Sequence, residues 1–216
     1  MNDSAPGDVH PIVCLHSLFL DPRMFDNIAE AGGDQYRFIA PELLGHATRL
    51  DEVSSTVTMK QVTDDVLNFI DDLGFPRFSL IGASMGGDVA LRIAARRPWS
   101  VEKLVLLGSS ARGQTQKDLG GFASLPSRIE QEGFSPEIVD MVMTIMFGAT
   151  TLADHSRRDI HELWKGQLTE LSPKLVHAVR AVFEREGAIQ HLRPGEGRNA
   201  HRVRHRRPWA APGVVR

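Results

Sequence analysis

Cysteine and long apolar runs are what this sequence has least of. Its 216 residues include one cysteine, Cys14, which excludes an internal disulfide framework and a zinc site built from thiolates. No apolar run approaches the roughly 18–20 residues that a membrane helix needs. Residues 1–16 carry acidic side chains but no basic segment, which argues against a signal peptide. We therefore expect no membrane association and a reducing, cytoplasmic location, with Cys14 buried inside an apolar run.

The sequence also lacks the patterns of nucleotide and metal sites. It contains neither a P-loop nor a G-x-G-x-x-G string, and the glycine-rich residues 82–87 have no lysine and the wrong glycine spacing for a phosphate loop. The central histidines show no spacing with acidic residues that would indicate a metal site; they are His46, His155, His161 and His177. We expect no cofactor and no metal.

The formal net charge of −2 divides between an acidic body and a basic tail. Residues 1–193 carry −7, whereas residues 194–216 carry +5 and contain no Leu, Ile, Phe or Met. Such a composition is typical of an out-of-frame translation of GC-rich DNA, and a one-base shift at Pro194 permits a proline-preceded apolar strand. We expect a truncated or frameshifted C-terminus. The alternative is a genuine basic, disordered tail that binds an acidic partner; nucleic acid is not expected, because Trp209 is the only aromatic residue in the tail.

Four short apolar runs alternate with helical patterns over the first half of the chain. The runs cover residues 11–16, 37–40, 77–82 and 103–108. Continuous apolar runs of this length are typical of strands buried on both faces of a parallel sheet. Between them, Asp21 and Pro22 begin one helix, and Thr58 with Gln61 forms a capping box for another that Gly74 ends. The pattern predicts an α/β fold, a mostly parallel sheet flanked by helices.

Beyond Ser110 the strand pattern stops. Residues 114–126 are rich in glycine and predict a loop with a short helix, whereas Ser135 and Ser172, each followed by proline, begin helical patterns, as do residues 158–169. We expect three regions: an α/β core over residues 1–111, an all-helical insert over 112–192 and the basic tail over 193–216.

One motif indicates a catalytic serine. Residues 82–87, Gly-Ala-Ser-Met-Gly-Gly, fit the pattern G-x-S-x-G, with a predicted strand before them and a predicted helix after them. Glycines on both sides allow the tight turn that lifts the Ser84 hydroxyl clear of the sheet at the start of the helix. There the helix dipole favours developing negative charge. The amide of Met85, with that of Leu18 in the loop after the first strand, would then donate to an oxyanion.

With these landmarks the chain resembles the α/β-hydrolase superfamily. The resemblance covers residues 11–190 and rests on residues 15–25, 40–46, 82–87 and 104–111; the first of these is most similar to the esterase and enol-lactonase branch. It implies Ser84 as nucleophile, Leu18 and Met85 as oxyanion donors, and the insert as a lid. Residues expected either to line the pocket or to pack the lid on the core are Phe19, Met141, Ile145, Met146 and Trp164.

The chain also departs from that family. Few residues precede Pro11, and the catalytic Asp and His that should follow Ser84 have no matching positions. His16 and His46 are expected to be structural, and the insert's histidines solvated. Without a base a serine is a weak nucleophile. We therefore predict a hydrolase of a small-molecule carboxylic ester or lactone acting through Ser84 but impaired, or alternatively a non-catalytic fragment or ligand-binding remnant of the fold. The oligomeric state stays open.

Overall fold

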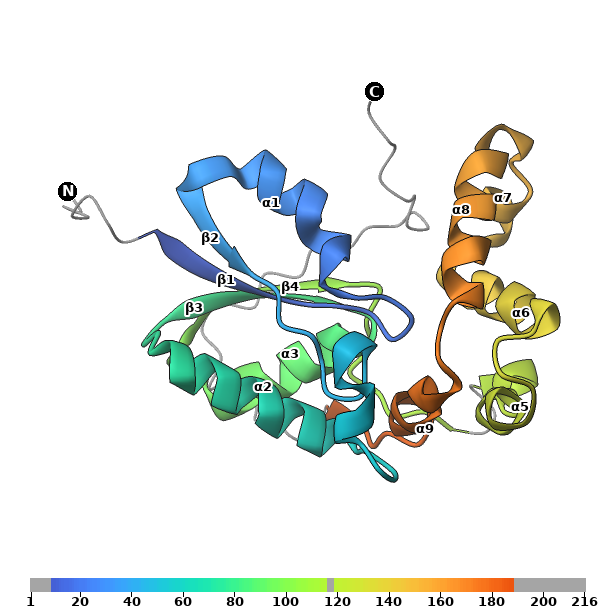
Figure 1. Cartoon of the computed structure of the whole chain (residues 1–216). Coiled ribbons are helices and arrows are strands. Elements are labelled where there is room, and N and C mark those ends of the chain that lie inside the picture. Colours follow the sequence, from blue (N-terminus) through green and yellow to red (C-terminus); the bar gives the residue numbers. More distant parts are fainter. Residues whose placement is uncertain (1–8, 116–118, 189–216) are drawn as a thin grey trace. The chain divides into compact units, whose positions relative to one another are not determined.

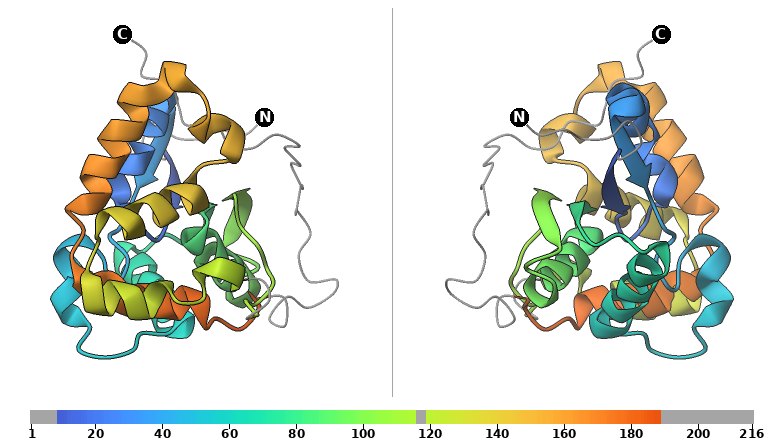
Figure 2. Two further views of the ribbon diagram at one scale, coloured as in Figure 1. Left: turned by 90° about the vertical axis from the view of Figure 1, so that its right-hand side faces the viewer. Right: turned by 90° about the vertical axis from the view of Figure 1, so that its left-hand side faces the viewer.

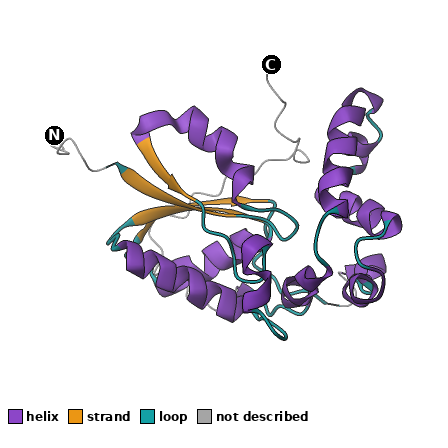
Figure 3. Cartoon of the chain, in the orientation of Figure 1, coloured by secondary structure: helices purple, strands orange, loops and turns teal. Residues whose placement is uncertain are grey.

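The computed structural model describes residues 9–115 and 119–188, which divide into two units. The first unit holds residues 9–115 and 177–188, and the second holds residues 119–176. All strands of the described chain lie in the first unit (Figure 3). Of the helices in the described ranges, none has the length and hydrophobicity to span a lipid bilayer.

The first unit is built on a parallel sheet of four strands in the order β2-β1-β3-β4. The strands are β1 (His10–Leu15), β2 (Tyr36–Ile39), β3 (Phe78–Ala83) and β4 (Val101–Leu107). They match the four predicted apolar runs to within two residues at each end. The parallel α/β class is therefore confirmed, and β1 and β3 occupy the centre, where Val13, Cys14 and Leu80 are fully buried.

Helices cover both faces of this sheet (Figure 1). Helix α1 (Asp26–Gly32) lies on one face, and α2 (Met59–Leu73) and α3 (Met85–Arg96) lie side by side on the other, as Figure 2 also shows. The predicted capping box of α2 is present: the Gln61 amide donates to Thr58 Oγ1 at 3.2 Å, and the Thr58 amide donates to Gln61 Oε1 at 2.9 Å. Gly74 ends α2 in the left-handed conformation. Local sequence thus defines the helix that supports the loop after β2.

The second unit is helical throughout its described residues. It contains α5 (Leu125–Glu132), α6 (Pro136–Met146), α7 (Ala149–Leu152) and α8 (Arg158–Thr169). Helix α9 (Val176–Phe183) begins at its last residue and continues into the first unit. The core of the second unit is formed by side chains that are almost fully buried: Leu125, Ile129, Ile138, Val142 and Leu168.

Short 3₁₀ helices connect several of these elements: Pro22–Phe25, Gly33–Gln35, Ala47–Glu52, Gly120–Phe122, His155–Arg157 and Pro173–Leu175. Residues 47–52, which follow β2, carry the ion pair between Arg49 and Glu52. The loop with a short helix predicted over residues 114–126 contains the 3₁₀ turn Gly120–Phe122, and α5 begins at its end and runs on to Glu132, beyond the predicted segment. The predicted tail over 193–216 lies outside the described residues.

Candidate functional site

Ser84 occupies the turn between β3 and α3 in a strained backbone conformation. Its φ and ψ are 49° and −110°; a positive φ is costly for a residue with a Cβ atom and persists where surrounding contacts enforce it. Three hydrogen bonds hold this conformation: the Ser84 amide donates to Leu107 O at 2.8 Å, and the Ser84 carbonyl accepts from the amides of Gly87 and Asp88 at 3.0 and 3.2 Å. The Ser109 hydroxyl lies 3.2 Å from the same carbonyl. Ser84 itself is exposed, whereas residues 85–93 are buried.

The glycines around Ser84 are required by close backbone approaches. A Cβ atom on Gly82 would lie 2.5 Å from the carbonyl oxygen of Gly86, and one on Gly86 would overlap the carbonyl oxygen of Leu15. One on Gly87 would overlap the side chain of Ser109. These contacts are the physical reason for the glycine pattern that the sequence shows. Ser109, which buttresses this turn from the end of β4, was not singled out from the sequence.

The loop after β1 lies against the Ser84 turn. Leu15 pairs with Gly82 in the register of β1 and β3, and the start of α3 at Gly86 packs against the carbonyls of Leu15 and His16. Leu18 and Phe19 follow in a buried turn. Met85 is the first residue of α3, where helix geometry leaves amide groups without a partner inside the helix. The structure therefore brings Ser84, Met85 and the 16–19 loop together at the carboxyl edge of the sheet.

Two buried histidines fix this loop. His16 Nε2 accepts from the Leu43 amide at 3.0 Å, so its proton sits on Nδ1, 3.0 Å from Ser17 O. The ring of His46 packs edge-on against the ring of His16, with 5.0 Å between the two ring centroids. Burial lowers the pKa of His16, and burial, with the neighbouring His16, lowers the pKa of His46 to about 3. Both rings are thus neutral parts of the scaffold, in agreement with the structural role expected for them.

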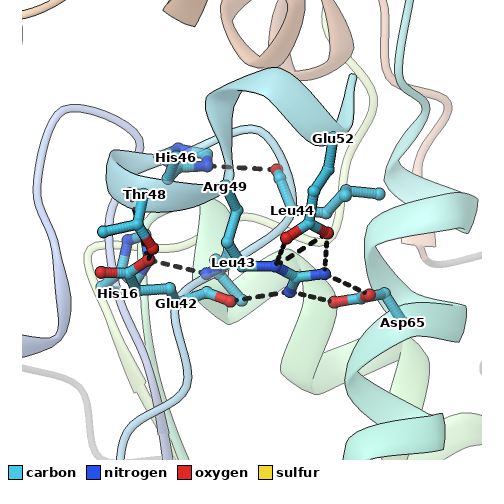
Figure 4. A network of polar contacts seen from close by, with 9 residues as sticks. All are labelled: His16, Glu42, Leu43, Leu44, His46, Thr48, Arg49, Glu52 and Asp65. Carbon is cyan, nitrogen blue, oxygen red and sulfur yellow. Dashed lines mark hydrogen bonds and ion pairs between the residues drawn. The ribbon is translucent and has the colours of Figure 1, made fainter. Parts of the chain in front are cut away.

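The segment behind these histidines is tied to α2 by Arg49 (Figure 4). Its guanidinium donates to both carboxylate oxygens of Asp65 at 2.7 and 2.8 Å, to Glu52 and to the carbonyl of Glu42 at 3.0 Å. The hydrogen bonds that Arg49 donates to Asp65, and then those to Glu52, raise the pKa of Arg49. Leu43, whose amide donates to His16, directly follows Glu42. The hydrogen bond from Arg49 to the Glu42 carbonyl therefore also helps to position the partner of His16.

Within the described part of the first unit, His10, His16 and His46 make their hydrogen bonds to groups other than the Ser84 hydroxyl. His10 lies at the start of β1, at the amino edge of the sheet, whereas Ser84 lies at the carboxyl edge. The Nε2 atom of His10 is 2.8 Å from Ser79 Oγ. His155 is exposed, but His161 was wrongly expected to be solvated: its Nε2 is buried, beside the ring of Phe147. His191, His201 and His205 lie outside the described residues. No group of three potential metal ligands occurs in the described chain.

The remaining predicted pocket residues lie in the second unit. Met141 and Met146 are half-buried on α6, Ile145 is exposed, and Trp164 on α8 contacts Phe147 with 6.3 Å between ring centroids. Phe19 is buried in the first unit. The assignment of these residues to a pocket stays a prediction.

A family model described as "alpha/beta hydrolase fold" matches residues 10–137. The chain belongs to the α/β hydrolase fold family. Among curated relatives, a putative non-heme haloperoxidase of Mycobacterium phage D29 is 33% identical over 132 residues, which are 58% of this chain and 46% of that protein. A pimeloyl-[acyl-carrier protein] methyl ester esterase of Nitrosomonas europaea is 28% identical over 104 residues, 48% of this chain and 39% of the relative. The chain thus spans about half the length of curated relatives that it matches.

Solved structures of this α/β hydrolase fold match a larger share of the chain. The enol-lactonase from Burkholderia xenovorans LB400 has a TM-score of 0.69 and 22% identity, covering 82% of this chain and 66% of that one. A thermophilic esterase from Thermogutta terrifontis has a TM-score of 0.70 and 24% identity, covering 84% and 66%. At these identities the likeness is one of fold.

Proposed function

We propose that this α/β-hydrolase chain carries the nucleophile half of a serine hydrolase acting on a carboxylic ester or an enol-lactone. The single observation that carries the proposal is the strained and exposed Ser84 at the start of α3. The flanking Gly82 and Gly86 cannot be replaced without a steric clash between the new Cβ and a neighbouring carbonyl oxygen. Strain of this kind persists at sites where function requires it. The esterase and lactonase names among the similar proteins support the same substrate class.

The proposed chemistry is acyl transfer. Ser84 Oγ attacks the ester carbonyl carbon, and the carbonyl electron pair moves onto oxygen, where the amides of Met85 and Leu18 would stabilise it. Collapse of this intermediate expels the alcohol and leaves an acyl-Ser84 ester that water hydrolyses. The hydroxyl proton needs a base, and His10, His16 and His46 of the first unit are engaged elsewhere. We therefore expect slow acylation by the chain as it stands.

The test is covalent labelling by a fluorophosphonate, followed by peptide mass spectrometry. We expect slow modification of Ser84 and its complete loss in Ser84→Ala. The matched control is Ser110→Ala, a change at an exposed serine beyond β4, which should label like the parent. Labelling that persists in Ser84→Ala would overturn the assignment.

A second candidate function is a ligand-binding chain that retains the fold without turnover. It is favoured by the hydrogen bonds of His10, His16 and His46, which in the first unit go to partners other than Ser84. Tight, non-covalent binding of an ester or lactone that is recovered unchanged, together with absence of fluorophosphonate labelling, would favour this alternative over the hydrolase.

A further inference from the structure

Two distant segments of the first unit run against each other without intervening side chains. Residues 111–114 precede the second unit, and residues 185–187 follow α9. The Gln114 amide donates to Arg185 O at 3.3 Å. A Cβ on Gly113 would lie 2.9 Å from Gly187 N, and one on Gly187 would lie 2.8 Å from Gly113 N. We call this contact the neck; it closes the excursion of residues 115–184, which contains the second unit and α9.

A buried ionic cluster stands beside the neck. Asp88, one helical turn beyond Ser84 on α3, accepts at Oδ2 from Arg92 Nε at 2.7 Å, and its Oδ1 lies 3.9 Å from Arg185 Nε. The side chains of Asp88, Arg92 and Arg185 are only 2%, 5% and 9% exposed. Burial lowers the pKa of Arg185, and the Asp88 carboxylate opposes that shift. The Asp88 carboxylate is therefore paired with two guanidinium groups away from water.

Both sides of the neck are joined to this cluster. Arg92 Nη2 donates to the Glu186 carbonyl, and Arg185 Nη1 donates to Val182 O at 2.8 Å. With the Gln114 amide turned so that its oxygen faces the guanidinium, Oε1 accepts from Arg185 Nη1 and Nη2 at 3.2 and 3.0 Å. The entering segment thus binds Arg185, the returning segment binds Arg92, and both arginines meet at Asp88.

We infer that Asp88 is a positioning residue that fastens both ends of the 115–184 excursion to the helix beginning at Ser84. Exposed ion pairs contribute little, but removing one partner of a buried pair leaves an uncompensated charge and is strongly destabilising. Replacing Asp88 would remove the buried carboxylate that Arg92 and Arg185 share at the neck. The consequence for catalysis rests on the proposed function, whereas the fastening itself does not.

The primary test is hydrogen exchange of the full chain. Asp88→Asn should accelerate exchange of the Gln114 amide by about tenfold or more relative to the amides of β3, because local opening of the neck becomes easier. Adding Arg185→Gln should restore part of the protection, since it removes a buried guanidinium that has lost its Asp88 partner. Arg97→Gln, which removes an exposed ion pair of α3 with Asp71, is the matched control and should leave Gln114 unchanged.

A second variant opens the neck without altering charge. Gly113→Ala places a methyl group against Gly187 N and Arg185 O and should accelerate Gln114 exchange in the same way, which keeps the test decisive if Asp88→Asn does not fold. Exchange of Gln114 in either variant at the rate of the Arg97→Gln control would overturn the inference.

A comparison of ester hydrolysis with the rate of Ser84 labelling distinguishes a positioning role of Asp88 from a loss of overall stability. If the parent hydrolyses aryl esters, Asp88→Asn and Gly113→Ala should raise KM for long acyl chains several-fold while the rate of Ser84 labelling by a small fluorophosphonate stays at the parent value. Equal loss in both readouts would contradict a positioning role. If the parent neither labels nor hydrolyses, the proposed function fails, and the exchange of Gln114 alone decides the inference.

Discussion

At the scale of single residues, the Ser84 turn follows from local sequence because steric exclusion is local. Gly82, Gly86 and Gly87 stand where backbone atoms of the 15–16 segment, the turn itself and Ser109 leave no room for a Cβ. A G-x-S-x-G string between strand and helix patterns was therefore sufficient to predict the turn. The partners that stabilise it, Leu107 and Ser109, come from β4 and could not be identified from the string alone.

Gly86→Ala should destabilise the protein by several kcal/mol, because the new Cβ overlaps the carbonyl of Leu15 and the backbone must shift. Gly166→Ala is the matched control: it lies inside α8, and its Cβ would meet nothing within 4 Å. There alanine should stabilise by about 0.5–1 kcal/mol through helix propensity. Urea unfolding at low micromolar concentration measures both. Equal effects of the two changes would show that the Gly86 contact is not rigid.

His46 makes stability depend on pH. Its pKa is about 3 in the folded chain and about 6.5 in an unfolded one, so the unfolded chain binds the proton more tightly. Its contribution to stability is therefore complete above pH 6.5 or so and is lost as the pH falls towards 3. Between pH 8 and pH 5 we expect a loss on the order of 2 kcal/mol from His46, with a further loss in the same direction from His16.

Urea unfolding at pH 5 and pH 8 measures this loss. His46→Gln should reduce the difference between the two pH values, and His155→Gln, at an exposed position, should leave it unchanged. A parent and a His46→Gln variant with identical pH dependence would refute the assignment of this loss to His46.

At the scale of elements, capping residues and apolar periodicity were informative where the signal is contiguous. Helix α8 covers Arg158–Thr169 as predicted, and α2 begins and ends at its expected Thr58 and Gly74 caps. The extent of α5 was missed because glycines at 120 and 121 dominate the preceding segment, although Leu125 and Ile129 have helical spacing and are fully buried. The hydrogen bond from Arg92 to Glu186 of the neck was not predictable, because the two residues are 94 positions apart and neither lies in a motif.

At the scale of the whole molecule, the sequence predicted the sheet and the helical insert, whereas an open edge beyond the fourth strand followed only from the family resemblance. Taken alone, the apolar run over residues 103–108 predicted a strand buried on both faces. In the described chain β4 is instead an edge strand, with Val105 and Leu106 45% and 37% exposed on opposite faces. Their exposure depends on which neighbours the sheet has, and no local pattern within the strand records that. Whether a shifted reading frame would supply a further strand concerns residues beyond those described.

This uncovered strand predicts that residues 1–216 self-associate. An edge strand offers unpaired backbone groups to another chain, and burying apolar surface contributes about 25 cal/mol per Å², so two β4 edges gain by pairing. The charges supply a competing cause, since an acidic body (−7) and a basic tail (+5) on different copies attract each other. Salt separates the two: screening weakens attraction between exposed charges, whereas hydrophobic association persists.

We expect association in sedimentation velocity that grows with protein concentration and is unchanged between 0.05 and 0.5 M NaCl, a range over which the Debye length falls about threefold. Val105→Lys should disperse it, because a charge on the edge strand opposes pairing. Ile28→Lys, which adds the same charge at an exposed apolar position on α1, should not. A parent that is monomeric and melts cooperatively at all concentrations would refute the prediction, and dispersal by salt alone would assign the association to the charged tail rather than to β4.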